Sequence, residues 1–172
     1  MLLPIGNDLL ARMDGSIARM NGIVEGLSTL TRVESTRVTR RSVDLTALAR
    51  RIATDLQSRQ PARKASVAIA ERLEASADET LVSIALENLL GNAWKCTDAR
   101  GVARIEVGHR SDVAGGVFFV SDNGFDLAHA ERHLEGYAIR LATARRVVER
   151  HGSRVWAESR RGQGTTIHFT LG

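Results

Sequence analysis

The chain has 172 residues, and 43% of them are hydrophobic, which is enough for a folded core and excludes a disordered tail. Its apolar runs are too short to span a membrane, and its first residues lack the pattern of a signal peptide. The single cysteine, Cys96, excludes a disulfide framework and a multi-cysteine zinc site. These features favour a cytoplasmic location without membrane contact.

The net charge of +4 is unevenly distributed along the chain. Residues 1–64 hold 11 basic and 6 acidic side chains, whereas the rest of the chain is close to neutral. An arginine-rich arm that binds a phosphate polymer is one explanation, and coding bias is another. Because extended cation blocks are absent and aromatic residues make up only 4% of the chain, we expect no nucleic-acid partner.

Residues 8–33 are predicted to form a long helix that starts at a cap on Asn7 or Asp8. Apolar side chains recur along it at steps of three and four residues: Leu9, Leu10, Met13, Ile17, Met20, Ile23, Val24, Leu27 and Leu30. A stripe this broad is typical of a helical bundle. We expect another chain or an absent segment to cover it, with packing on the same domain as the alternative.

Residues 34–43 are predicted to be a polar connector, followed by a helix that Asp44 caps and Pro61 ends. Beyond it we predict helices and strands in mixed order, with helices at 78–96 and 139–151 and strands at 67–69, 104–107, 116–120, 154–158 and 165–171. Adjacent strands indicate antiparallel pairs. The predicted class is α+β: a two-layer α/β sandwich whose mixed sheet carries helices on one face, preceded by a long bundle-forming helix.

Three polar clusters have the residue types of a binding site. In the first, Asn88 and Asn92 are four residues apart on a helix and share a face, and Lys95 follows three residues later. Amide oxygens are suitable ligands for Mg²⁺, and lysine pairs with phosphate. The polar outer edge of a buried helix is the alternative interpretation.

The other two clusters lie at strand ends. Asp122 and Gly124 follow an apolar strand, where a carboxylate can accept a hydrogen bond from a ring amine such as that of adenine. Gly164 and Thr165 open the last strand, and glycine lets a ligand approach the backbone closely. Taken singly, both clusters are better explained as ordinary turns.

In this order and at these spacings the clusters resemble the sequence boxes of bacterial sensor histidine kinases. Residues 86–97 resemble the N-box, 120–124 the G1 box, 141–152 the helix after the G2 box, and 162–165 the G3 box. The helix at 8–33 resembles the second helix of the dimerisation domain. Kinases attached to phytochrome- or PAS-type sensors are the most similar subgroup.

The resemblance implies a Bergerat-type (GHKL) fold with two parts: residues 1–40, the second dimerisation helix and connector, and residues 41–172, the ATP-binding catalytic domain. The implied reaction moves the γ-phosphoryl group of ATP to a histidine and then to an aspartate of a response regulator. The implied partners are a second copy bound through residues 8–33, a response regulator and an upstream sensory domain.

The resemblance also implies roles for individual residues. Asn88 and Lys95 would act at the phosphates, Asn92 would hold Mg²⁺, and Asp122 would bind the adenine amine. The full implied set for ATP and Mg²⁺ is Asn88, Asn92, Lys95, Asp122, Gly124, Gly136, Gly164 and Thr165. The related ATPases of DNA topology and protein folding carry a glutamate where this chain has Asn88, so a kinase is favoured.

The sequence departs from the family pattern in three ways. The histidines, His109, His129, His133, His151 and His168, all fall in the sandwich, so the acceptor histidine is expected on another chain or in an absent segment. The G1 box lacks its second glycine. The lid has only nine residues, 127–135, and the G2 box, residues 136–142, carries Ala138 and Arg140 in place of glycines.

Arg140 stands where the backbone of the family approaches phosphate. Its side chain would either fill the site or replace a lost contact with its charge, and from the sequence we favour filling or weakening. The alternative function is therefore a pseudokinase: a dimeric scaffold that does not bind ATP and acts in a phosphorelay through protein–protein contacts.

Overall fold

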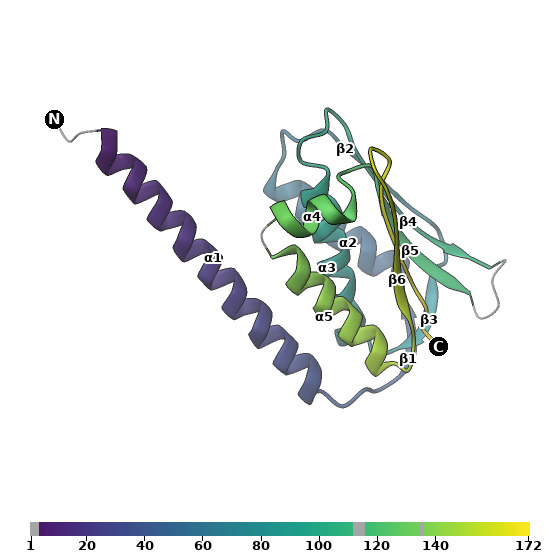
Figure 1. Ribbon diagram of the computed structural model, residues 1–172. Helices are drawn as coiled ribbons and strands as arrows, with labels where there is room; N and C mark the ends of the chain where they lie inside the picture. The colour runs from purple at the N-terminus through teal and green to yellow at the C-terminus, as the bar shows by residue number, and fades with distance from the viewer. Residues whose placement is uncertain (1–3, 112–115, 135) are drawn as a thin grey trace.

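A computed structural model describes residues 4–111, 116–134 and 136–172, without the side chains of 4–15, 17–19, 132 and 133. Figure 1 shows the long helix α1 on one side, a group of helices beside it, and a twisted sheet beyond them. The elements are α1 (Pro4–Ser35), β1 (Arg41–Asp44), α2 (Leu45–Arg59), β2 (Ala65–Ile69), β3 (Glu74–Ala77), α3 (Glu79–Cys96), β4 (Ala103–Arg110), β5 (Val117–Asp122), α4 (Leu127–His133), α5 (Tyr137–Arg150), β6 (Val155–Arg160) and β7 (Gly164–Phe169). None of the described helices combines the length and apolar character needed to cross a bilayer.

Helix α1 begins earlier than predicted. It starts at Pro4, so the prediction of a cap at Asn7 or Asp8 is wrong. Proline suits the first helical turn because its φ is already helical and its missing N–H has no partner to lose there. The predicted stripe residues Leu9, Leu10, Met13 and Ile17 have side chains that lie outside the described part of the chain.

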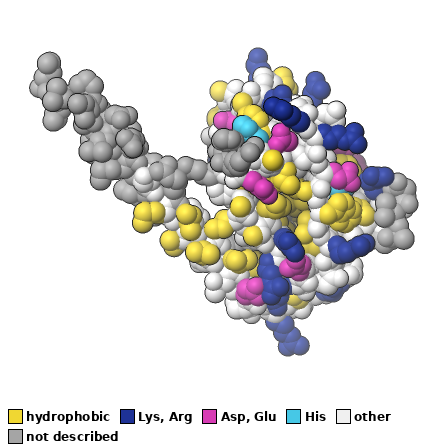
Figure 2. Space-filling view, viewed as in Figure 1, with side chains coloured by type: hydrophobic (Ala, Val, Ile, Leu, Met, Phe, Trp, Pro, Cys, Tyr) yellow, Lys and Arg dark blue, Asp and Glu magenta, His cyan; other side chains and the backbone are white. Residues whose placement is uncertain are grey.

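Most of the described part of the apolar stripe on α1 faces solvent, whereas Leu30 is half-buried. Met20, Val24 and Leu27 lie on one face of the helix and are 65%, 65% and 51% exposed. Figure 2 shows hydrophobic side chains gathered along this part of α1. Within the described chain, the stripe therefore has the exposure expected of a surface that another helix covers.

A different face of α1 packs against α5. Gly26 lies so close to α5 that a Cβ atom built on it would be 2.6 Å from Cγ2 of Ile139. At the C-terminal end of α1, Val33 is fully buried, and its carbonyl oxygen accepts a hydrogen bond from Arg150. Arg146 donates to the Glu34 carboxylate at 2.8 Å. These contacts fix α1 alongside α5 (Figure 1).

The predicted connector at 34–43 is only partly irregular. Its last residues form β1, which pairs with β3 in an antiparallel two-stranded sheet. Neither strand was predicted, because each has only four residues and β1 is mostly polar. The predicted cap is confirmed: the Asp44 carboxylate accepts from the Ala47 N–H at 2.9 Å, and α2 follows.

The main sheet has the strand order β2-β4-β5-β7-β6. β2 and β4 are parallel, and the other neighbours are antiparallel. Helices α2, α3 and α5 lie on one face of the sheet (Figure 1), and the main core, which includes Leu86, Val120, Val147 and Ile167, is buried between these layers. This architecture confirms the predicted α+β class, in which helices cover one face of a mixed sheet.

The predicted lid, residues 127–135, contains an unpredicted short helix. α4 is capped by Asp126, whose carboxylate accepts from the His129 N–H at 2.9 Å. Its seven residues are too few for an apolar period to stand out in the sequence. α4 brings Ala130 into a small buried cluster with Cys96 and Tyr137, here called the Tyr137 cluster.

The turn before β7 offers a test of backbone strain. Gly162 and Gly164 both have positive φ, +78° and +95°, but a Cβ atom on Gly164 would lie 1.8 Å from the carbonyl oxygen of Asp122, whereas nothing lies within 4 Å of Gly162. We expect Gly162→Ala to lower the free energy of unfolding by about 1 kcal/mol. Gly164→Ala should cost at least about 2 kcal/mol more, because a backbone clash adds to the strain. Urea unfolding of both variants measures the difference, and equal losses would contradict it.

Candidate nucleotide-binding site

Helix α3 carries the first predicted cluster. The Asp78 carboxylate caps the helix by accepting from the Leu81 N–H at 3.1 Å, and buried apolar side chains occur along most of the helix. The helix packs between α2 and α5. Of its polar residues, Asn92 is buried, Asn88 is half-buried and Lys95 is exposed. The four-residue spacing read from the sequence is therefore kept on one continuous helix.

Asn92 lies in the contact between α3 and the start of α5. It is only 5% exposed, and its Nδ2 donates to the carbonyl oxygen of Tyr137 at 3.3 Å. Its Oδ1 is buried and accepts no hydrogen bond from any described residue. An unpaired buried acceptor costs about 1–3 kcal/mol, which a cation or a donor from a ligand would recover.

This unpaired oxygen fits the implied magnesium site. Asparagine Oδ1 is a hard oxygen ligand, and Mg²⁺ in nucleotide sites takes few protein ligands together with phosphate oxygens. In the described chain no group of three or more His, Cys, Asp or Glu side chains is arranged to hold a metal. A divalent cation would therefore depend on Asn92 and on the phosphates of the nucleotide.

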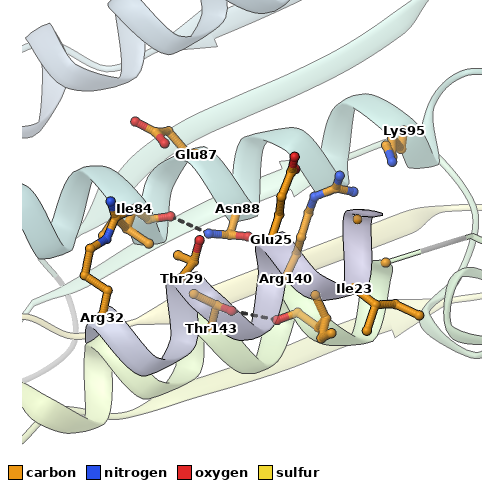
Figure 3. A pocket seen from close by; sticks show the side chains of 14 residues that line it. Ile23, Glu25, Thr29, Arg32, Ile84, Glu87, Asn88, Lys95, Arg140 and Thr143 are labelled. Atoms are coloured by element: carbon orange, nitrogen blue, oxygen red, sulfur yellow. Dashed lines mark hydrogen bonds between the residues drawn. The ribbon is translucent and has the colours of Figure 1, made fainter. Parts of the chain in front are cut away.

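A cavity of about 690 Å³ lies where α1, α3 and the start of α5 meet. It is here called the interhelix cavity, and its volume is within the range of small-molecule sites. Its walls include the predicted residues Asn88, Lys95 and Gly136, and Arg140 extends into it from α5 (Figure 3). The Nδ2 atom of Asn88 donates to the Ile84 carbonyl oxygen at 2.7 Å.

The interhelix cavity also has residues that the sequence did not indicate. Glu25, Thr29 and Arg32 of α1 line its other side (Figure 3). They precede the start of α3 at Glu79 by at least 47 residues, and no motif links them to the N-box. Only the docking of α1 on α5 brings them to the site.

The Arg140 side chain is half-buried in the wall of the cavity. Its Nη1 atom is buried without a hydrogen-bond partner, and no described carboxylate forms an ion pair with it. Burial lowers the pKa of Arg140. Gly136, at the N-terminus of the same helix, has a left-handed conformation and makes no side-chain cap. The cavity therefore combines a helix N-terminus with an unpaired guanidinium.

The remaining predicted residues, Asp122, Gly124, Gly164 and Thr165, form a second group, here called the sheet-end group. The Gly124 N–H donates to the Asp122 Oδ1 at 2.8 Å, and Asp122 pairs with Thr165 across β5 and β7. A Cβ atom on Gly124 would lie 2.4 Å from the Cys96 carbonyl oxygen, so only glycine fits there. None of the four lines the interhelix cavity.

Asp122 is held in an environment that opposes its charge. Burial raises its pKa to about 7, although the N–H groups of Gly124 and Thr165 and the charge of Arg100 act in the other direction. A carboxyl group with this pKa changes its charge near neutral pH. It is suited to a polar ligand that supplies a donor at this end of the sheet.

Tyr137 connects the two groups. Its carbonyl oxygen accepts from Asn92, and its ring is 3% exposed. Burial raises its pKa, and the charges of Cys96 and Asp122 add to the effect, so the phenol lies near the sheet-end group. The structure therefore brings the predicted residues together in two groups, with Tyr137 between them.

The comparisons with known proteins agree with this geometry. The model of the family "Histidine kinase-, DNA gyrase B-, and HSP90-like ATPase" matches residues 77–172. The methanogenesis regulatory histidine kinase FilI of Methanothrix harundinacea is 41% identical over 106 residues, which are 55% of this chain and 12% of FilI. The adaptive-response sensory kinase SasA of a Synechococcus strain is 38% identical over 100 residues, 50% of this chain and 26% of SasA.

Longer matches extend over α1. Cyanobacterial phytochrome B of a Nostoc strain is 26% identical over 96% of this chain and 24% of its own length. The crystal structure of full-length ShkA in complex with AMPPNP has the same fold, with a TM-score of 0.68 at 22% identity over 99% of this chain and 39% of ShkA. The chain thus spans about a quarter or less of the length of FilI, SasA and phytochrome B.

The family model covers more than half of the chain, and it includes α3, the turns at Gly124 and Gly164, and α5. The relatives that match this part at 38–41% identity are sensory or regulatory histidine kinases. The chain therefore belongs to the histidine kinase-, DNA gyrase B- and HSP90-like ATPases and contains the catalytic ATP-binding domain of a sensor histidine kinase.

Proposed function

We propose that this chain binds Mg-ATP and transfers its γ-phosphoryl group to a histidine outside residues 1–172, from which an aspartate of a response regulator then receives it. The observation that carries the proposal is the buried, unpaired Oδ1 of Asn92. Asn92 is not among the residues that line the interhelix cavity, but on α3 it lies between Asn88 and Lys95, which do. The cavity wall has three cationic side chains, Arg32, Lys95 and Arg140, and two carboxylates, Glu25 and Glu87. A phosphate-bound magnesium ion meets both requirements, because it bonds the oxygen while its phosphates neutralise the cations.

Each predicted residue has a role in this proposal. Asp122 accepts from the adenine amine, and the base approaches at Gly124, whose N–H donates to the Asp122 carboxylate. Asn88, Lys95 and the N-terminus of α5 at Gly136 bind the phosphates. Gly164 and Thr165 support Asp122 from β7. The division of the chain at residue 40, just before β1, separates the dimerisation helix from this domain.

The reaction breaks the bond between the γ-phosphorus and the oxygen that bridges to the β-phosphate. A nitrogen of the acceptor imidazole forms the new bond, and ADP leaves. Bound magnesium would neutralise charge on the phosphate oxygens as this happens. The protein's contribution is to hold the triphosphate between α3 and α5 in the geometry of transfer.

The scaffold function remains the second candidate, and Tyr137 is the observation that favours it. This residue replaces the threonine of the G2 box, and its ring is buried near Asp122, where the base would bind. A nucleotide would have to displace the ring. In the scaffold function it stays in place, and the domain acts through protein contacts alone.

We propose a homodimer through residues 8–33 in either case. The exposed stripe of Met20, Val24 and Leu27 supports it, since a second copy of α1 would remove this apolar surface from water. The response regulator and the upstream sensory domain are proposed as partners on the strength of the family.

Calorimetric titration with ATP distinguishes the two functions. We expect magnesium-dependent binding in the micromolar range, and Asn92→Ala should weaken it at least about tenfold because the metal ligand is lost. Asn21→Ala, at an exposed asparagine of α1, is the matched control and should bind like the wild type. A folded wild type that takes up no ATP at millimolar concentration would favour the scaffold.

The dimer is tested by placing a charge on the stripe. Val24→Glu should shift the chain from dimer to monomer in size-exclusion chromatography with light scattering, because a buried carboxylate has no partner there. Asn21→Glu, on another side of the same helix, should leave the dimer intact. A wild type that is monomeric at all concentrations would overturn the proposed interface.

The raised pKa of Asp122 predicts a pH dependence of stability. Because the folded chain holds this proton more tightly than the unfolded chain, the stabilising effect is complete below about pH 4 and is lost as the pH rises through 7. Asp122→Asn should therefore exceed the wild type in free energy of unfolding by about 2–4 kcal/mol at pH 8 and match it near pH 4.

Urea unfolding at the two pH values measures this difference. Asp55→Asn, on an exposed face of α2, should follow the wild-type pH dependence. If the free energies of unfolding of Asp122→Asn and the wild type differ by the same amount at both pH values, the buried carboxyl group does not change its protonation on folding.

A further inference from the structure

Arg140 is the feature of the cavity that the family pattern does not explain. It stands in the first turn of α5, where the G2 box normally has a glycine, and its side chain extends towards α3 between Glu25 and Lys95 (Figure 3). The Arg140 Nη1 is buried without a hydrogen-bond partner. A fold gains nothing from such a group, so its presence points to a ligand that completes it.

The side chain lines the interhelix cavity without filling it. The volume of about 690 Å³ is the space that remains with Arg140 in place. The sequence left open whether this side chain fills the site or replaces a lost contact, and the remaining volume supports the second possibility.

The guanidinium also lies near the N-terminus of its own helix. A Cβ atom built on Gly136 would be 3.8 Å from Nη1 of Arg140, and Gly136 provides no side-chain cap. Lys95 lines the same cavity. Although Glu25 and Glu87 also line this cavity, its end at the start of α5 brings together a helix N-terminus, the Lys95 ammonium and the unpaired Nη1 of Arg140, and each of these favours an anion.

We propose that Arg140 is a phosphate-binding residue of this domain, whose guanidinium takes over the contacts that the missing glycines would have provided through the backbone. A planar guanidinium donates two parallel hydrogen bonds to phosphate oxygens, which compensates for fewer exposed N–H groups. This inference rests on the proposed nucleotide site and names a residue that determines its specificity for phosphates.

The test compares ligands with and without phosphates. ATP, adenosine and inorganic tripolyphosphate, each with Mg²⁺, are titrated into the wild type, Arg140→Gln and Arg140→Lys. Arg145→Gln, on the exposed side of the same helix, is the matched control. Arg140→Gln should weaken ATP and tripolyphosphate about 10- to 100-fold and leave adenosine unchanged, and Arg140→Lys should retain part of the affinity.

Thermal unfolding supplies a second measurement. Without ligand, Arg140→Gln should melt about 2–4 °C above the wild type, since a half-buried guanidinium with an unpaired Nη1 is removed. Tripolyphosphate should raise the melting temperature of the wild type and of Arg145→Gln but not that of Arg140→Gln. A residue with only a structural role would instead lower the melting temperature on substitution and leave the ATP affinity unchanged.

The outcomes separate this inference from the proposed function. If Arg140→Gln binds ATP as tightly as the wild type or more tightly, Arg140 obstructs the site and the inference is wrong. If the wild type binds tripolyphosphate through Arg140 but neither ATP nor adenosine, the phosphate site stands and the proposed function fails. If the wild type binds none of the three, both are overturned.

Discussion

The packing of α3 against α5 is the contact on which the rest of the structure depends. It buries apolar side chains of α3 and brings Asn92 of α3 against the first turn of α5, where its amide donates to the carbonyl oxygen of Tyr137. The same contact places the N-terminus of α5 beside Lys95 and Asn88. Because both helices lie on one face of the sheet, the sheet-end group meets them at the end of β5. A nucleotide site in this fold is a consequence of that layer arrangement.

Helix α1 closes one side of the site. Without α1, the residues of α3 and α5 would form an open surface, whereas with α1 docked they line a cavity. Its C-terminal end is fixed by buried Val33 and by the ion pair of Glu34 with Arg146. From there the helix runs along α5, and Gly26 allows the close approach. The wall that α1 contributes to the cavity therefore depends on contacts at the far end of α5.

Polar groups of the site are unfavourable for folding in the absence of a ligand. Asn92 and Arg140 each have a buried atom without a hydrogen-bond partner, and burial raises the pKa of Asp122 to about 7. Buried polar groups at the other end of α3 are paired: His151 accepts from the Asp78 N–H, and Thr46 bridges to Leu73 and Ala70. Among the described residues, Nδ1 of His168 on β7 is also buried without a hydrogen-bond partner, but the unpaired atoms of Asn92 and Arg140 both lie where α3 meets the start of α5.

Local features of this protein could be predicted from its sequence. The spacing of Asn88, Asn92 and Lys95 on one helix, the cap at Asp44 and the antiparallel strand pairs follow from periods and short-range hydrogen bonds. It took tertiary packing to show that Glu25, Thr29 and Arg32 share a cavity with α3, and that Arg140 lines this cavity without a partner. These relations depend on how α1 docks on α5, and docking joins residues too distant in the chain for any local pattern to record.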